Sequence, residues 1–153
     1  MKPLLNKLNL GCGKDYRYGY INTDISKHVG ADLVFDMTKG LPFKDDSFEE
    51  IIVNNALTQI EKNKHFVKVM NEIWRVSTPT SSILVRVPNS QDVCSFQDPM
   101  DSRRFTEESF TYMQYDHRRY EQYGKHYGFA PFKVELLDNN GRQMTFKLCP
   151  KKD

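Results

Sequence analysis

The stretch LNLGCGKD, residues 8–15, decides the fold of this 153-residue chain. Its apolar run, residues 8–10, predicts a strand that leads directly into Gly11 and Gly13. Glycines at that place let the backbone turn sharply and let a ligand approach without a Cβ in the way. Taken by itself, a Gly-x-Gly pair is also compatible with a plain tight turn, so the surrounding chain has to decide between the two interpretations.

Further strands follow at short intervals. Short apolar runs broken by turn residues predict strands at residues 20–25, 31–35, 48–53 and 83–87. The last two runs are rich in β-branched residues and nearly continuous, which is typical of parallel strands covered on both faces. The sequence therefore predicts a parallel central sheet.

One long helix is indicated between the last two of these strands, within residues 61–76. Apolar side chains recur there at helical spacing and share one face with Ser77: Phe66, Met70, Ile73 and Trp74. A strand, a helix and a second strand form the right-handed crossover of open α/β sheets. The gaps at residues 11–19 and 26–30 are too short for such a helix, so we expect a fold with reduced helices and one thinly covered sheet face.

The C-terminal third predicts two helices and a hairpin. Thr106 can cap a helix over the segment FTEESFTYM, and residues 116–128 predict a second helix that ends at Gly128. The alternating segment around Asn139, Asn140 and Gly141 predicts an antiparallel hairpin at one edge of the sheet. With no repeat or linker, residues 1–153 are expected to form a single domain.

Composition excludes few functions. Lys and Arg number 22 and Asp and Glu number 20, so the net charge of +2 indicates neither a nucleic-acid nor a membrane partner. The start of the chain lacks a signal-peptide pattern, so a cytoplasmic protein is expected. The 3 cysteines fit neither a disulfide framework nor a paired metal-binding spacing, and no metal site is predicted.

Asp24 is a candidate ligand residue at the end of the second predicted strand. A carboxylate there can accept hydrogen bonds from both hydroxyls of a ribose, although a capping or turn aspartate is the alternative. A dinucleotide-binding fingerprint would need glycine at position 16, where this chain has Tyr16, and an acidic residue further along. A nicotinamide cofactor is therefore disfavoured.

Five segments in order resemble one protein family: LNLGCG, YINTDI, ADLVFDMTKGLPFKDDSFEEIIVNNAL, NEIWRV and VRVPN. Over about residues 7–148 the chain resembles the class I methyltransferases that use S-adenosyl-L-methionine (SAM), particularly the small branch related to ubiquinone/menaquinone-biosynthesis enzymes. The resemblance implies an α/β Rossmann-like fold, with a mostly parallel sheet and an antiparallel C-terminal hairpin.

The resemblance also implies the residues that hold SAM: Gly11, Cys12, Gly13, Asp24, Ile25, Asp36, Met37 and Asn54. The glycine turn would lie beside the methionine part, and Asp24 would hold the ribose. Asp36 would accept the adenine amino group while the Met37 amide meets a ring nitrogen, with residues 41–43 as a wall. Asn54 would lie near the methionine amino group and the sulfonium. A turn aspartate is the alternative for Asp36.

The chain departs from the family pattern at several positions. Asn9 stands where many relatives have an acidic residue, and Asp15 stands where many have a third glycine. The segment 57–59, Leu-Thr-Gln, replaces a frequent Leu-Glu-His. Downstream, the segment DPMDSRRFTEESF resembles a family motif in which Asp101 takes a histidine position and Arg103 takes the arginine position, which makes both candidates for substrate binding.

The expected activity is methyl transfer from SAM to an unidentified acceptor, with a small or sugar-like molecule favoured. Transfer to a hydroxyl needs a base, and the candidates by chemistry are Asp101, Tyr112 and His117. A group of arginines could meet an anionic substrate or simply be solvated: Arg103, Arg104, Arg118 and Arg119.

Two other functions stay open at this point. The chain could be a non-catalytic SAM-binding module that acts as a partner or regulatory subunit, or it could be a nicotinamide enzyme. The thinly covered sheet face also suggests a homodimer that buries an exposed apolar surface.

Overall fold

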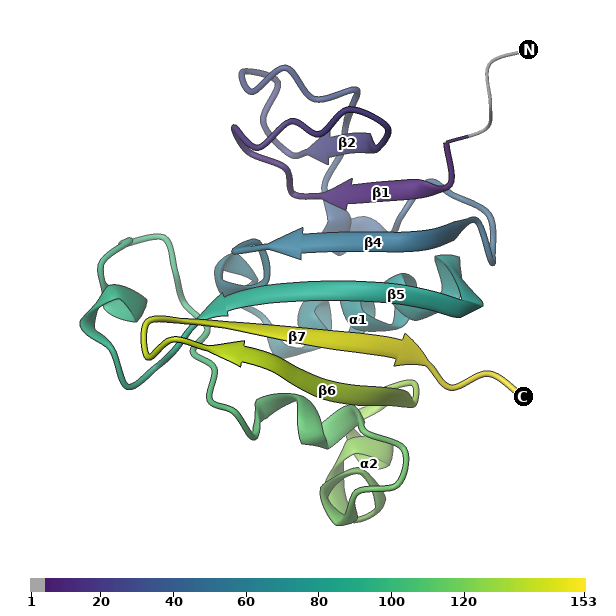
Figure 1. Ribbon diagram of the computed structural model, residues 1–153, viewed down its shortest axis with the longest axis vertical. Coiled ribbons are helices and arrows are strands. Elements are labelled where there is room, and N and C mark those ends of the chain that lie inside the picture. Colours follow the sequence, from purple (N-terminus) through teal and green to yellow (C-terminus); the bar gives the residue numbers. More distant parts are fainter. Residues whose placement is uncertain (1–4) are drawn as a thin grey trace.

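The strands of the computed structural model, which describes residues 5–153, form a single sheet (Figure 1). They are β1 (Lys7–Leu10), β2 (Ile21–Asp24), β3 (Leu33–Val34), β4 (Phe48–Asn54), β5 (Ser77–Pro88), β6 (Phe132–Asn139) and β7 (Gln143–Pro150). Their order is β3-β2-β1-β4-β5-β7-β6. Neighbours from β3 to β5 pair in parallel, and β7 is antiparallel to both β5 and β6. The predicted parallel sheet with an antiparallel C-terminal hairpin is confirmed.

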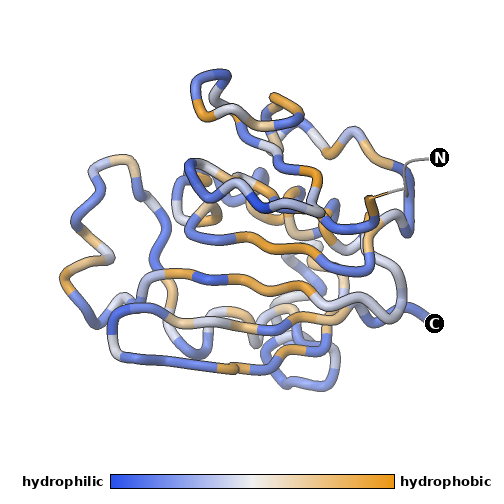
Figure 2. The backbone as a smooth tube through the Cα atoms, turned by 45° about the horizontal axis from the view of Figure 1, so that its top comes forward, coloured by the Kyte–Doolittle hydropathy of each residue, from blue (hydrophilic) through white to orange (hydrophobic). Residues whose placement is uncertain are grey.

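The predicted long helix is α1 (Asn63–Val76), which lies behind the sheet in Figure 1. Its buried side chains are Phe66, Val69, Met70, Ile73 and Val76. They join a core with one row of the sheet, in which cross-strand partners share a face: Leu8, Ile51, Ile83 and Leu148. Figure 2 shows the hydrophobic residues concentrated along the central strands. Burial of each such side chain contributes roughly 1.5–3 kcal/mol.

The remaining helices are short, as the reduced fold predicted. The only α-helix besides α1 in residues 5–153 is α2 (Lys125–Tyr127), which follows a π-helical turn at Tyr120–Gly124 and ends at Gly128 with φ +93°. No helix in this part of the chain has the length and apolar character needed to cross a membrane. The expectation that the chain starts without a signal peptide concerns a segment whose first residues, 1–4, lie outside the described residues.

The prediction of a helix capped by Thr106 is wrong. A 3-10 helix forms instead, and it begins only at Ser109 and ends at Met113. The Thr106 hydroxyl accepts a hydrogen bond from the Glu108 amide, while the Ser109 hydroxyl accepts one from the Thr106 amide at 2.8 Å. These side-chain bonds close a local turn, which competes with the α-helical hydrogen-bond pattern.

The sheet face opposite α1 is largely polar, with Lys7, Glu50 and Arg86 among its side chains. The Tyr20 hydroxyl donates to Glu50 there, and burial together with this bond raises the pKa of Tyr20 to about 12. The broad apolar face that motivated the homodimer hypothesis is therefore not found. Among the strand residues, the exposed large apolar side chains lie on the two edge strands: Leu33 and Val34 on β3, and Leu136 and Leu137 on β6.

Candidate functional site

A cavity of about 440 Å³ lies where the carboxyl ends of β1, β2 and β4 meet. We call it the strand-end cavity. All eight residues predicted to hold a cofactor line it: Gly11, Cys12, Gly13, Asp24, Ile25, Asp36, Met37 and Asn54. Parallel strands bring their carboxyl ends to one edge of the sheet, which explains why positions spread over 44 residues of chain converge.

The glycine turn is packed too tightly for any side chain at its first position. Gly11 has φ +69°, and a Cβ built on it would lie 2.7 Å from the Cβ of Ala56. Gly13 has φ +52° but has no heavy atom within 4 Å of its would-be Cβ. Gly11 is therefore required both by its backbone conformation and by the approach of the loop after β4.

Asp24 holds the glycine turn as well as lining the cavity. One carboxylate oxygen accepts the Gly13 amide at 2.9 Å, and the other accepts the Ser26 amide at 2.9 Å. Asp24 therefore does act as a turn aspartate, which was the alternative to ligand binding. Each carboxylate oxygen has a second lone pair, so Asp24 can still accept hydrogen bonds from ligand hydroxyls.

Asp36 caps the short 3-10 helix Met37–Lys39. Its Oδ1 accepts both the amide and the hydroxyl of Thr38, at 2.9 and 2.7 Å. The Thr38 hydrogen bonds lower the pKa of Asp36, so the carboxylate is ionised at neutral pH. Capping uses Oδ1 only, which leaves Oδ2 with both of its lone pairs for a donor in the cavity.

Cys12 contributes a neutral thiol to the cavity wall. Burial, followed by the nearby Asp24 carboxylate, raises the pKa of the thiol. Its amide donates to the Thr23 carbonyl at 2.8 Å, and its sulfur lies 3.5 Å from the Gly13 carbonyl. A thiol with a raised pKa is a poor nucleophile, so Cys12 belongs to the turn rather than to covalent chemistry.

Asn9 closes the loop after β1. Its buried side-chain amide donates to the Asp15 carbonyl at 2.7 Å and to Asn22 Oδ1 at 2.9 Å. Asn22 Oδ1 also accepts the Arg17 amide at 2.8 Å. An ionised acid at position 9 could not donate these bonds, so the asparagine amide suits the loop that this chain carries.

Sequence reasoning missed five residues of the strand-end cavity: Thr38, Asn55, Ala56, Gln59 and Ile60. Asn55 has φ +53°, and its amide donates to the Arg86 carbonyl at 2.9 Å. Asparagine tolerates left-handed backbone better than most residues, so the Asn-Asn pair at the end of β4 was an available signal. Gln59 carries no comparable local signal.

A second cavity of about 380 Å³ adjoins the first and shares Asn55 and Gln59 with it. We call it the adjoining cavity. Asp101 lines it, and the buried Thr58 hydroxyl donates to Asp101 Oδ1 at 2.8 Å. Gln143 Oε1 in its wall is buried and has no hydrogen-bond partner within residues 5–153. The predicted substrate residue Asp101 thus lies next to the strand-end cavity.

Other predicted residues are not brought to these cavities, which corrects the expectation. Arg103 and Tyr112 line a separate cavity on the α1 side. His117 lies in neither, and its Nδ1 accepts the Arg119 amide at 3.1 Å. In the predicted wall, Leu41 belongs to the core and Phe43 packs edge-on against Phe48. The direction of a side chain depends on packing against distant parts of the chain, and the spacing of residues in the sequence does not predict that packing.

The histidine, cysteine and carboxylate side chains of residues 5–153 form no group of three or more suited to a metal ion.

No protein-family model matches the sequence, and no curated protein matches it.

Solved structures do match the fold. A SAM-dependent methyltransferase from Archaeoglobus fulgidus is 14% identical, with 97% of this chain and 89% of that chain covered at a TM-score of 0.60. A possible histamine N-methyltransferase from Thermotoga maritima is 14% identical, covering 95% and 82% at 0.63.

DhpI in its SAM-HEP complex is 10% identical, covering 94% and 78% at a TM-score of 0.65. These matches extend over 94–97% of this chain. The chain therefore has the Rossmann-like fold of the class I SAM-dependent methyltransferases.

Proposed function

We propose that the chain binds SAM in the strand-end cavity and transfers its methyl group to a polar small or sugar-like acceptor in the adjoining cavity. The observation that carries the proposal is the convergence of the eight predicted residues on one cavity. The matched structures share the fold, and one of them is a complex with SAM.

The residues of the cavity suit the parts of SAM. Ionised Asp36 has Oδ2 available for the adenine amino group, and Asp24 has lone pairs available for ribose hydroxyls. The glycine turn leaves room for the methionine part beside Gly13, whose would-be Cβ meets no heavy atom within 4 Å. These carboxylates also complement the positive charge of the sulfonium.

When bound, the cofactor supplies a methyl group on a good leaving group, so the protein mainly has to align the acceptor and exclude water. Gln59 and Asn55, at the junction of the two cavities, are placed to orient an acceptor. Asp101 Oδ2 is the candidate to accept a proton from an acceptor hydroxyl. The bond from Thr58 fixes its carboxylate, so the absence of the family's Glu-His pair does not leave the site without a polar group.

The first test is a thermal shift with SAM, S-adenosylhomocysteine and NAD, with Asp24→Asn as the variant. SAM and S-adenosylhomocysteine should raise the melting temperature of the wild type, because a ligand that binds only the native state stabilises it. Asp24→Asn should weaken SAM binding about tenfold or more, since hydrogen bonds to a charged group contribute about 1.5–3 kcal/mol.

The matched control is Asp138→Asn, on the exposed part of β6. It should keep the full ligand shift. Asp24→Asn also loses part of the bond to Gly13 or Ser26, so each variant is compared with its own ligand-free melting temperature. Stabilisation by NAD alone would refute the proposed cofactor, and an unchanged SAM shift in Asp24→Asn would refute the proposed role of Asp24 in holding it.

Catalysis is tested separately from binding. Wild-type protein mixed with SAM and an acceptor pool should produce S-adenosylhomocysteine, and Asp101→Asn should lower turnover while keeping the SAM-induced shift. A non-catalytic module would show the shift and no turnover with any acceptor pool.

A further inference from the structure

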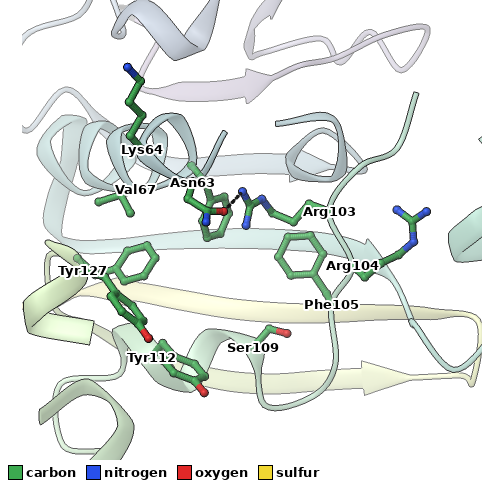
Figure 3. Close-up of a pocket in the computed structure, with 11 residues that line it drawn as sticks. Asn63, Lys64, Val67, Arg103, Arg104, Phe105, Ser109, Tyr112 and Tyr127 are labelled. Carbon is green, nitrogen blue, oxygen red and sulfur yellow. Dashed lines mark hydrogen bonds between the residues drawn. The ribbon is translucent and has the colours of Figure 1, made fainter. Parts of the chain in front are cut away.

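A third cavity, of about 780 Å³, lies between the start of α1, the segment 103–109 and residues 112–129 (Figure 3). We call it the aromatic cavity. It shares no lining residue with the strand-end or the adjoining cavity, so it is a separate place on the molecule. The function proposed above does not use it.

The wall of the aromatic cavity consists mainly of rings: Phe66, Phe105, Tyr112, Tyr127 and Phe129. Tyr112 and Tyr127 are nearly parallel, with ring centroids 6.2 Å apart and an interplanar angle of 20°. Figure 3 shows these two tyrosines side by side, with Phe105 on another side of the cavity. Tyr127 is 56% exposed, so part of its ring is open to solvent.

The charges in the aromatic cavity all have one sign. Lys64, Arg103 and Arg104 line it, and none of its lining residues within the described chain is an Asp or a Glu. Arg104 points away from the rings in Figure 3 and lies over Phe96 at 4.5 Å. The Lys64 side chain also extends away from the rings in Figure 3, so Arg103 is the cation available to a ligand beside them.

Arg103 is held in place without a counter-ion. Its Nε donates to the Ile60 carbonyl at 3.1 Å, and its Nη2 donates to Asn63 Oδ1 at 3.0 Å, as the dashed line in Figure 3 marks. The guanidinium lies 4.3 Å from the Phe66 ring centroid. None of the ion pairs formed within residues 5–153 includes Arg103. Burial lowers the pKa of this guanidinium, which nevertheless stays charged at neutral pH.

A fixed, partly desolvated arginine without a carboxylate partner attracts an anion, because a planar guanidinium matches the oxygens of a carboxylate, sulfonate or phosphate. Its Nη1 makes no hydrogen bond to residues 5–153 and remains as a donor. The exposed ring of Tyr127 and the half-buried ring of Tyr112 favour a flat apolar body that can stack on them. A cationic ligand would be repelled by Arg103, and an aliphatic anion would not stack on these two rings.

We propose that the aromatic cavity is a binding site for a small aromatic anion, with the anionic group on Arg103 and the aromatic body against Tyr127, Tyr112 and Phe129. The site is distinct from the proposed methyltransferase site and does not depend on it. Lys64 adds positive charge at the rim of the cavity.

The test uses 8-anilinonaphthalene-1-sulfonate, a dye that is an aromatic anion and fluoresces in apolar sites. Folded wild-type protein should bind it saturably with a stoichiometry of about one. Uncharged N-phenyl-1-naphthylamine has the same ring system without the sulfonate, and it should bind about tenfold or more weakly, since a charge-assisted contact contributes about 1.5–3 kcal/mol.

Two pocket variants carry the test. Arg103→Gln should weaken dye binding about tenfold and should have a much smaller effect on the uncharged analogue. Because Arg103 also bonds the Ile60 carbonyl, this variant could loosen the neighbouring chain. Tyr127→Ser removes an exposed ring that makes no side-chain hydrogen bond within residues 5–153, and it should weaken both dyes several-fold.

Matched controls are Arg118→Gln, an exposed arginine outside the cavity, and Tyr18→Ser, a tyrosine that is 93% exposed elsewhere. Both should bind the dye as the wild type does, and near-ultraviolet circular dichroism checks that every variant keeps its tertiary packing. No saturable binding to the folded wild type, equal affinity for the two dyes, or unchanged binding in both pocket variants would overturn the proposal.

Discussion

Gly11→Ala should destabilise the folded chain by about 2–5 kcal/mol. A non-glycine residue in the left-handed region costs roughly 1–2 kcal/mol, and Gly11 has φ +69°. The new Cβ would lie 2.7 Å from the Cβ of Ala56, well inside the ordinary carbon contact of about 3.5–4.0 Å. Relief of such overpacking costs typically about 1–3 kcal/mol. The two contributions add because they act on the same native backbone.

Gly19→Ala is the matched control for backbone strain. Gly19 has φ +85°, and its would-be Cβ meets no heavy atom within 4 Å. This variant should therefore lose only about 1–2 kcal/mol. Urea unfolding, followed by circular dichroism without ligand, gives the free energy of unfolding of each variant.

A double-mutant cycle with Ala56→Gly isolates the contact. Removal of the Ala56 methyl gives the new Cβ room, so Gly11→Ala should cost only its strain in the Ala56→Gly background. The expected coupling energy is about 1–3 kcal/mol. Equal costs for Gly11→Ala in the two backgrounds, or equal costs for Gly11→Ala and Gly19→Ala, would show that the loop after β4 does not press on the glycine turn.

Gly124→Ala should be strongly destabilising in urea unfolding despite the helical φ/ψ of this residue, because a Cβ would lie 1.7 Å from the Tyr112 carbonyl oxygen; a neutral effect would refute this contact. In an ultraviolet titration, Tyr20 should ionise near pH 12. Since the folded pKa of Tyr20 is raised, its contribution to the free energy of unfolding is complete below the unfolded pKa of about 10 and is lost as pH rises towards 12. Tyr20→Phe should remove this pH-dependent loss of stability. Arg75→Lys should lower stability by about 1–2 kcal/mol, because lysine cannot reproduce the two bonds of 2.8 Å to Glu72, and unchanged unfolding would contradict that role.

Several elements could be predicted because their sequence signals are local. The glycine turn after β1, the periodic apolar face of α1, the Asn-Asn-Gly hairpin and the cap at Gly128 all follow from short-range rules, and each is found. The strand-end positions of the residues predicted to hold a cofactor followed from the same patterns, because parallel strands deliver their carboxyl ends to one edge.

The tertiary structure alone decided which side chains meet. It placed Asp101 beside the strand-end cavity through a bond to Thr58, 43 positions away, and turned Arg103 to a different cavity only two positions further on. It also replaced the helix after Thr106 by a turn and a 3-10 helix. Backbone propensity and spacing act over a few residues, whereas the direction of a side chain is set by whatever the fold packs against it, and that information is spread over the whole chain.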